Sequence, residues 1–109
     1  MNVLITGTNR GIGLQMVKSA VSKQWRVFAC CRNPHEAHKL SEVARMSGGL
    51  VSMHILDVAD KAQIQALAYE LRNETIDILI NNAGVYGSTD NSFGHTDHED
   101  WLNTFRINT

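Results

Sequence analysis

Cysteine, proline and aromatic residues are scarce in this chain of 109 residues, which has two cysteines, one proline and 6% aromatic residues. A disulfide framework needs several spaced cysteines, whereas Cys30 and Cys31 are adjacent. Neighbouring residues of a strand point to opposite faces of a sheet, so these two thiols are poorly placed to pair. We therefore interpret both as small buried apolar side chains.

Long apolar runs and an excess of charge are also missing. Runs such as residues 27–31 are far shorter than the roughly 20 residues that cross a bilayer. A strand-like segment begins at Val3, where a secretory leader would otherwise lie, so we expect a cytoplasmic protein. Ten basic and eleven acidic side chains give a net charge of −1. This balance predicts no nucleic-acid partner and no membrane partner.

The remaining composition, 43% apolar and 19% charged, is that of an ordinary globular chain, and the length fits one domain at most. Four short apolar runs alternate with longer amphipathic stretches. The runs are residues 3–6, 26–31, 50–55 and 76–80. This alternation predicts an α/β fold, namely a Rossmann-like doubly wound parallel sheet of four strands in the order 3-2-1-4 with flanking helices.

The stretches between the runs carry helix signals. Asn33 before Pro34 indicates a helix start, and the Gly48-Gly49 pair indicates a helix stop. Asp60 should cap the third helix. Two stretches have apolar residues at helical spacing, Leu14, Val17 and Val21 in the first, and Ile64, Leu67, Ala68 and Leu71 in the third.

The last predicted helix is cut short. A capping box at residues 96–99 opens onto a stripe of Trp101 and Phe105, and the sequence stops soon afterwards without a C-cap. We therefore expect the chain to be a partial domain, truncated on its C-terminal side. The predicted strand at residues 76–80 then lies at a sheet edge with unpaired backbone groups. We expect self-association through this strand or through the Trp101 helix.

The most informative segment is Thr-Gly-Thr-Asn-Arg-Gly-Ile-Gly, residues 6–13, which follows a predicted strand and opens a predicted helix. Gly7 permits a tight turn, Gly11 permits close approach to a pyrophosphate, and Gly13 permits close packing of the helix. The helix N–H groups would then face the anion. The spacing favours a dinucleotide, because no Gly-Lys-Ser/Thr follows as in nucleoside triphosphate sites. Asn9 and Arg10 are cofactor-binding candidates in the same loop.

A second motif, Asn-Asn-Ala-Gly at residues 81–84, directly follows the fourth predicted strand. In the order 3-2-1-4, the ends of strands one and four flank the topological switch point, where ligands of open α/β sheets bind. The small residues Ala83 and Gly84 leave room there for a ribose. The alternative interpretation of this motif is an asparagine-rich turn.

Together the two motifs resemble the short-chain dehydrogenase/reductase family, which has Thr-Gly-x-x-x-Gly-x-Gly and Asn-Asn-Ala-Gly at corresponding places. The resemblance covers the whole chain. Residues 3–13 and the segment Ala-Cys-Cys-Arg-Asn-Pro at residues 29–34 are most similar to small carbonyl-reductase-type members related to the C-factor group.

The resemblance implies roles for further residues. Asp57, followed by Val58, would contact the adenine, although a carboxylate in a turn is the alternative. Asn81 would brace the central strands, while Ile12 and Gly84 would lie near the nicotinamide end. Asn108 matches the catalytic asparagine of the family, and a polar amide on an apolar helix face needs a partner or a function.

The end of the second predicted strand decides the expected cofactor. A site that prefers NAD(H) places an acidic residue there to bind the ribose hydroxyls, whereas this chain has Arg32 and Asn33. Arg32 and Arg10 could both reach a 2′-phosphate, and one charge-assisted hydrogen bond is worth about 1.5–3 kcal/mol. We therefore expect NADP(H) to be preferred over NAD(H). Asn33 could alternatively serve only as a helix cap.

Other kinds of site find little support in the sequence. The pairs His35/His38 and His95/His98 have no convincing third or fourth ligand, so we predict no metal site. We assign no chemistry to His54. A nucleophilic serine site is disfavoured because the chain has no Gly-x-Ser-x-Gly elbow.

The proton-delivery pair that the resemblance implies, Tyr-x-x-x-Lys, is missing, because Asn73 and Asp90 stand four residues beyond the two tyrosines. We therefore hypothesise that the intact protein is an NADP(H)-dependent oxidoreductase that acts on a small carbonyl or alcohol substrate. These 109 residues would be its cofactor-binding part and inactive alone. The alternative is a non-catalytic dinucleotide-binding or protein-interaction module.

Overall fold

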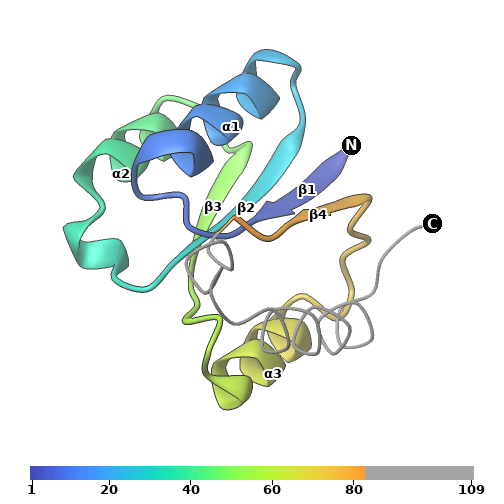
Figure 1. Cartoon of the computed structure of the whole chain (residues 1–109). Coiled ribbons are helices and arrows are strands. Elements are labelled where there is room, and N and C mark those ends of the chain that lie inside the picture. The colour runs from blue at the N-terminus through green and yellow to red at the C-terminus, as the bar shows by residue number, and fades with distance from the viewer. Residues whose placement is uncertain (83–109) are drawn as a thin grey trace.

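The computed structural model describes residues 1–82, in which strands and helices alternate (Figure 1). The elements are β1 (Asn2–Ile5), α1 (Gly11–Ser22), β2 (Arg26–Cys31), the short 3-10 helix η1 (Pro34–Glu36), α2 (His38–Arg45), β3 (Val51–Ile55), α3 (Lys61–Glu70) and β4 (Ile78–Ile80). Ala83, Gly84, Asn108 and the predicted Trp101 helix lie outside the described residues. None of the helices within residues 1–82 has the length and apolarity that a membrane crossing requires.

The strands form a parallel sheet in the order β3-β2-β1-β4, which confirms the predicted order. β1 is central and places Val3 opposite Val27 of β2 on one side and Ile78 of β4 on the other. Just beyond β1, the Thr6 N–H donates to the Ile80 carbonyl at 3.0 Å. The carboxyl ends of β1 and β4 therefore meet at the switch point of the sheet, where ligands of such folds bind.

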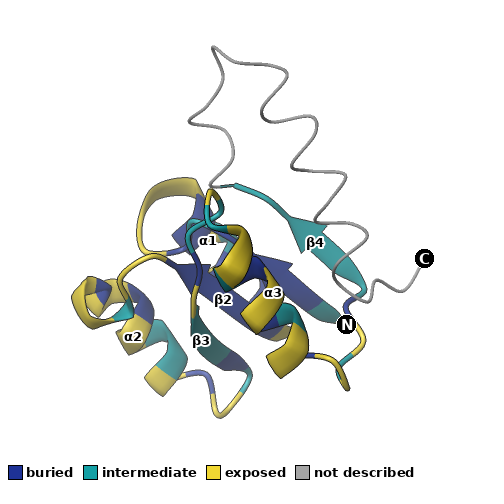
Figure 2. Ribbon diagram, turned by 90° about the horizontal axis from the view of Figure 1, so that it is seen from below, coloured by how far each residue is buried: buried dark blue, intermediate teal, exposed yellow. Residues whose placement is uncertain are grey.

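Helices cover both faces of the sheet, with α1 and α2 on one side and α3 on the other (Figure 1). Successive side chains of β2 alternate between the two apolar clusters, with Val27, Ala29 and Cys31 in the first and Phe28 and Cys30 in the second. Figure 2 shows the result, a buried centre of the sheet beneath helices whose outer sides are exposed. Both cysteines are free and buried, as predicted.

The predicted apolar faces of the first and third helices are confirmed. Leu14 and Val17 of α1 are buried against the sheet, as are Ile64 and Leu67 of α3. Burying one such side chain stabilises the fold by roughly 1.5–3 kcal/mol. The predicted cap of α3 is also present, because the Asp60 carboxylate accepts hydrogen bonds from the first turn of the helix.

The stretch after β2 departs from the sequence prediction of one helix that starts at Asn33. Pro34 fixes one turn of 3-10 helix, which the Ala37 N–H closes by donating to the Pro34 carbonyl at 3.1 Å. Ala37 is 2% exposed, and the α-helix starts again only after this buried residue. Asn33 occupies the N-cap position of the 3-10 turn, as predicted, but its side chain makes no capping hydrogen bond.

The fourth strand begins later than predicted, at Ile78 rather than Ile76. The side chain of Asp77 explains the difference. Its Oδ2 accepts a hydrogen bond from the Asn2 N–H at 2.8 Å. In a regular parallel ladder, a backbone carbonyl of the neighbouring strand would accept this hydrogen bond. All three residues of β4 are half-buried, and the strand forms one edge of the sheet, as predicted.

Candidate functional site: a glycine loop at the switch point

The segment of residues 6–13 forms the loop between β1 and the first turn of α1. Gly7 has a φ of 63° and Gly11 a φ of 62°, a left-handed conformation that residues with a Cβ rarely adopt. Between them, Thr8 is completely buried, and its hydroxyl donates to the Cys30 carbonyl at 2.9 Å. The loop is therefore fastened to the end of β2 as well as to β1.

Gly13 is the residue at which this loop is most tightly packed. A Cβ at Gly13 would lie 2.0 Å from the Gly7 carbonyl oxygen and 2.9 Å from Nδ2 of Asn82. Both distances are shorter than the non-bonded contacts that Cβ atoms make in proteins. The requirement for glycine at this position therefore comes from the loop folding back onto the helix, a more local cause than packing of the helix on the sheet.

Two asparagines that follow β4 hold the loop from the other side. Thr6 Oγ1 donates to Oδ1 of Asn81 at 3.0 Å, and Asn82 Nδ2 donates to the Gly7 carbonyl at 3.1 Å. Asn81 thus links the residues that follow β1 and β4. Sequence reasoning missed Asn82 and Thr8 as positioning residues, although both stand inside the two motifs.

The first turn of α1 is open, in contrast to the crowded side of the loop. Arg10 precedes the helix in an extended conformation, and its side chain makes no capping hydrogen bond. A Cβ at Gly11 would meet nothing within 4 Å, and Ile12 is 69% exposed. Backbone N–H groups at the start of a helix lack partners within the helix and carry a partial positive charge. This turn can therefore receive an anion.

The end of β2 carries a positive charge next to this open turn. Arg32 directly follows the last residue of β2, and the buried Thr8 hydroxyl already joins the glycine loop to Cys30 of that strand. Arg32 and Asn33 are exposed, as are Asn9 and Arg10 of the loop. No ion pair of Arg10 or Arg32 occurs within residues 1–82, so both guanidinium groups can bind an external anion.

Asp57 and Val58 lie after β3 and are the last of the predicted cofactor-binding residues that fall within residues 1–82. Oδ1 of Asp57 accepts a hydrogen bond from the Ala59 N–H at 3.0 Å, and its own N–H donates to Gln63 Oε1 at 2.8 Å. Asp57 therefore has the turn role that was its alternative interpretation. Val58 is half-buried against the α3 cluster.

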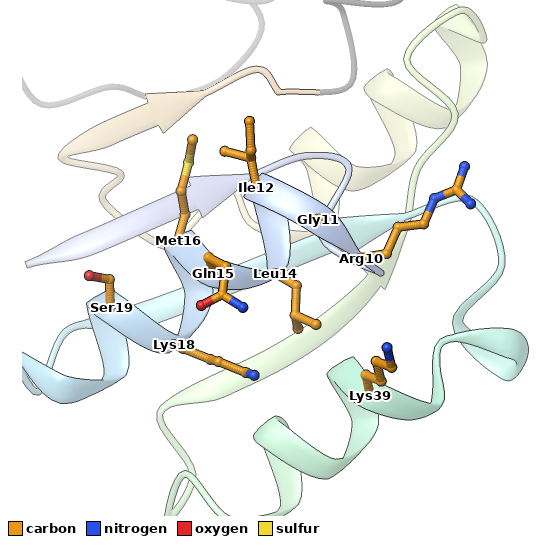
Figure 3. Close-up of a pocket in the computed structure, with 9 residues that line it drawn as sticks. All are labelled: Arg10, Gly11, Ile12, Leu14, Gln15, Met16, Lys18, Ser19 and Lys39. Atoms are coloured by element: carbon orange, nitrogen blue, oxygen red, sulfur yellow. The ribbon is translucent and has the colours of Figure 1, made fainter.

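A groove of about 600 Å³ runs from the open turn along α1 towards α2 (Figure 3). Its lining combines the residue before α1 and most of the length of α1 with one residue of α2, and the residues are Arg10, Gly11, Ile12, Leu14, Gln15, Met16, Lys18, Ser19 and Lys39. Three of these side chains are basic and none is acidic. The groove therefore offers positive charge beside the uncapped helix start.

The other reactive side chains of residues 1–82 do not form a comparable site. Burial raises the pKa of the Cys30 and Cys31 thiols, which keeps both as unreactive thiols. His54, to which the sequence assigned no chemistry, contacts Ser52 Oγ through Nε2 at 2.8 Å and lies 3.6 Å from Glu70. Within this described part of the chain, no three histidine, cysteine, aspartate or glutamate side chains gather to hold a metal ion.

Comparisons with known proteins agree with this arrangement. The family model of the short chain dehydrogenase matches residues 1–109. The 3-oxoacyl-acyl-carrier-protein reductase of Haemophilus influenzae is 33% identical over 108 residues, which are 96% of this chain and 42% of that protein. The (+)-neomenthol dehydrogenase of Arabidopsis thaliana is 34% identical over 90 residues, 77% of this chain and 30% of that protein.

A crystal structure of a carbonyl reductase from Pseudomonas aeruginosa PAO1 in complex with NADP has the same fold over this region. Its TM-score is 0.70 at 30% sequence identity, and the match covers 73% of this chain and 36% of that chain. The chain thus spans well under half the length of the relatives that it matches.

Proposed function

The chain belongs to the short-chain dehydrogenase family, and we propose that it is the dinucleotide-binding part of an NADP(H)-dependent oxidoreductase that acts on a carbonyl or alcohol substrate. The observation that carries this proposal is the uncapped first turn of α1, which lies at the switch point beside Arg10 and open space over Gly11. We further propose a member of the carbonyl-reductase type, related to the C-factor group. The carbonyl reductase of Pseudomonas aeruginosa supports this assignment.

The residues of the loop fit the pyrophosphate of a dinucleotide. The backbone at Gly11 can be approached closely because no side chain covers it, and the N–H groups of the first turn of α1 can donate to phosphate oxygens. The helix end contributes about 0.3–1 kcal/mol, and up to ~2 kcal/mol when partly buried. This turn therefore orients the phosphates, and other contacts must supply most of the affinity.

The two arginines select the cofactor in this proposal. Arg10 and Arg32 are exposed and follow β1 and β2 at the same end of the sheet, and neither Arg32 nor Asn33, the two residues after β2, is acidic. A charge-assisted hydrogen bond of about 1.5–3 kcal/mol from either guanidinium to a 2′-phosphate gives a roughly ten- to hundredfold preference for NADP(H). Asn33 and Asn9, exposed beside them, are further candidates for ribose or phosphate contacts.

The remaining cofactor contacts follow the family pattern. Oδ1 of Asp57 already accepts a hydrogen bond within its turn, so Oδ2 would accept a hydrogen bond from the adenine amino group. Val58 would lie beside the adenine ring. Asn81 would hold the strand ends in place. Ile12, Ala83 and Gly84 would lie towards the nicotinamide, the last two outside the described residues.

Hydride transfer is the chemistry that a bound nicotinamide supplies. This chain's own residues bind and orient the cofactor, while Asn108 is proposed as its one catalytic residue. A Tyr-x-x-x-Lys pair for proton delivery does not occur in the 109 residues. We therefore infer that the chain alone binds cofactor weakly and reduces nothing. The substrate would be recognised in the whole protein, which we place in the cytoplasm because free buried thiols suit a reducing compartment.

The test is a titration of the 109-residue chain with NADPH and with NADH, followed through backbone amide resonances. We expect NADPH to bind at least tenfold more tightly and to shift the Gly11, Ile12 and Arg32 amides. Arg32→Gln should lower the preference roughly tenfold or more, whereas the matched surface variant Arg45→Gln should retain it. Aldehydes and ketones should not be reduced. Tighter binding of NADH would contradict the cofactor proposal, and binding of neither would contradict the function.

The edge of the sheet favours a second proposal, self-association of the chain. β4 is a half-buried apolar edge strand in the described part of the molecule, and such an edge can pair with another chain. The predicted Trp101 helix is the other proposed contact. Ile78→Lys at this edge should lower the molar mass in light scattering towards that of a monomer, and a monomeric unmodified chain would contradict the proposal. Such an interface would also suit a non-catalytic module, the alternative to the enzyme.

A further inference from the structure

Lys39 is a basic side chain in the candidate site that neither sequence motif contains. It lies in the first turn of α2, next to Leu40, which is completely buried in the core. Together with the buried Ala37, Leu40 anchors this turn to the sheet, so the base of the Lys39 side chain has a fixed position. Lys39 itself is exposed and makes no ion pair within residues 1–82.

Lys39 lines the groove between α1 and α2 together with Arg10 and Gly11 of the glycine loop. Lys39 and Arg10 line this same groove, and Figure 3 shows the Lys39 ammonium pointing from α2 towards the part of the groove below Arg10. Lys18 also lines the groove, but it lies two turns further along α1, roughly 10 Å beyond Gly11 at 1.5 Å per residue. Lys18 therefore contributes its charge from further along α1, whereas Lys39 contributes its charge from the first turn of α2.

No negatively charged side chain faces the Lys39 ammonium group from the lining of the groove. Glu42, one turn further along α2, is held by the Arg45 guanidinium instead. A lysine acts as a point charge on a flexible stem, so it can attract an anion at the surface without a fixed fork of hydrogen bonds.

We propose that Lys39 is a specificity-determining residue, the third cation that attracts the 2′-phosphate on the adenosine ribose of the cofactor. This inference rests on the proposed function. The phosphate would lie between Arg10 of the loop and Arg32 after β2, with Lys39 approaching it from α2. At the surface such a contact is screened over a Debye length of about 8 Å at physiological salt, so its effect is smaller than that of an arginine in direct contact.

The test compares two ligands that differ only in the phosphate concerned, adenosine 2′,5′-bisphosphate and adenosine 5′-phosphate. Lys39→Gln should weaken binding of the bisphosphate about three- to tenfold and binding of the monophosphate by less than about twofold. Lys23→Gln removes the same charge from the residue that follows α1, outside the groove, and should change both affinities little and equally. Lys39→Arg, which keeps the charge, should retain the preference.

The salt dependence gives an independent readout. The fall in bisphosphate affinity with rising salt should be shallower for Lys39→Gln than for the unmodified chain, because one fewer cation contributes. Equal weakening of both ligands, or no weakening, in Lys39→Gln would overturn the role of Lys39 while leaving the proposed function intact. If the unmodified chain showed no preference for the bisphosphate, the proposed NADP(H) specificity and the role of Lys39 would both fail.

Discussion

The first turns of α1 and α3 differ although both helices follow a strand of the same sheet. Asp60 closes the start of α3, where its Oδ1 accepts from the N–H groups of Ala62 at 3.0 Å and Gln63 at 3.2 Å. Arg10 stands at the equivalent position of α1 and makes no such hydrogen bond. Backbone groups at the start of α3 are thus satisfied by a side chain of the chain itself, whereas the start of α1 has no side-chain cap. The comparison separates a helix start that is closed by its own cap from one that is open, and we propose that the open one binds the cofactor.

α1 is held in place by close packing instead of a cap. Gly13 lies directly against the Gly7 carbonyl, and Asn82 donates to that same carbonyl. The loop therefore keeps its shape without using the N–H groups of the first turn. This division predicts that changes on the packed side of the loop affect folding, while changes on the open side affect binding.

The largest effect is expected from Gly13→Ala. Alanine is the better helix former by about 1 kcal/mol, but its Cβ would lie 2.0 Å from backbone that has little freedom to move. We expect the free energy of unfolding to fall by roughly 2–4 kcal/mol, measured by urea denaturation, because the loop or the helix must shift.

Gly48→Ala is the control for Gly13→Ala. Gly48 has a φ of 68° but open space around its Cβ position, so alanine there adds only backbone strain of about 1–2 kcal/mol. Equal losses in the two variants would show that the contact between Gly13 and Gly7 has no special cost.

The next effect is expected from Arg10→Asn, which gives α1 the kind of cap that α3 has. The residue already has the extended backbone of an N-cap, so asparagine should raise the free energy of unfolding by about 0.5–1 kcal/mol. Binding of NADPH should weaken tenfold or more, since a cation is lost and the first N–H groups become occupied. A variant that gained stability and kept its affinity would refute the binding role of this turn.

Asp60→Ala tests the other helix and should have a smaller effect. Two hydrogen bonds to the first turn of α3 are lost, and caps of this kind are worth about 1 kcal/mol. Urea denaturation measures the loss. Asp60→Asn keeps the accepting oxygen and should restore most of the stability. If asparagine failed to rescue, the charge of Asp60 would matter more than its hydrogen bonds.

Local signals in the sequence predicted much of this comparison. The two helix faces and the Asp60 cap follow from periodicity and capping chemistry, which depend on neighbouring residues, and the strand order follows from the doubly wound fold class that the alternation of strands and helices indicates. The glycine loop was recognised from the spacing of its glycines between a predicted strand and a predicted helix, and Gly7 and Gly11 have the positive φ that glycine adopts most readily.

Contacts between distant residues were not predictable in the same way. Asn82 bonds to Gly7 across 75 residues, and Asp77 replaces a strand contact of Asn2 across the same distance in sequence. The break at Ala37 depends on burial of that residue in the core. Lys39 belongs to the groove only because α1 and α2 pack on the same face of the sheet. Each of these features requires the folded chain, because no local pattern encodes them.

The smallest expected effect lies at the other end of α3, where Glu70 approaches His54 of β3. Burial lowers the pKa of His54; the nearby Glu70 carboxylate raises it in part, and Arg26 lowers it further. Ser52 and the Phe28 ring also face the imidazole. Because the unfolded chain takes up a proton near pH 6.5 that the folded chain resists, stability should fall as the pH drops below about 6.5.

His54→Gln should therefore flatten the decrease in unfolding free energy between about pH 7 and pH 5. The change in slope should stay below about 1.4 kcal/mol per pH unit, the limit for one proton. Glu70→Gln should have the opposite effect and steepen the decrease, since the carboxylate that favours the protonated imidazole is removed. Urea denaturation at several pH values measures both slopes. If Glu70→Gln instead left the slope unchanged or flattened the decrease, the Glu70 carboxylate 3.6 Å from His54 would not favour the protonated imidazole, and burial and Arg26 alone would determine how this histidine titrates.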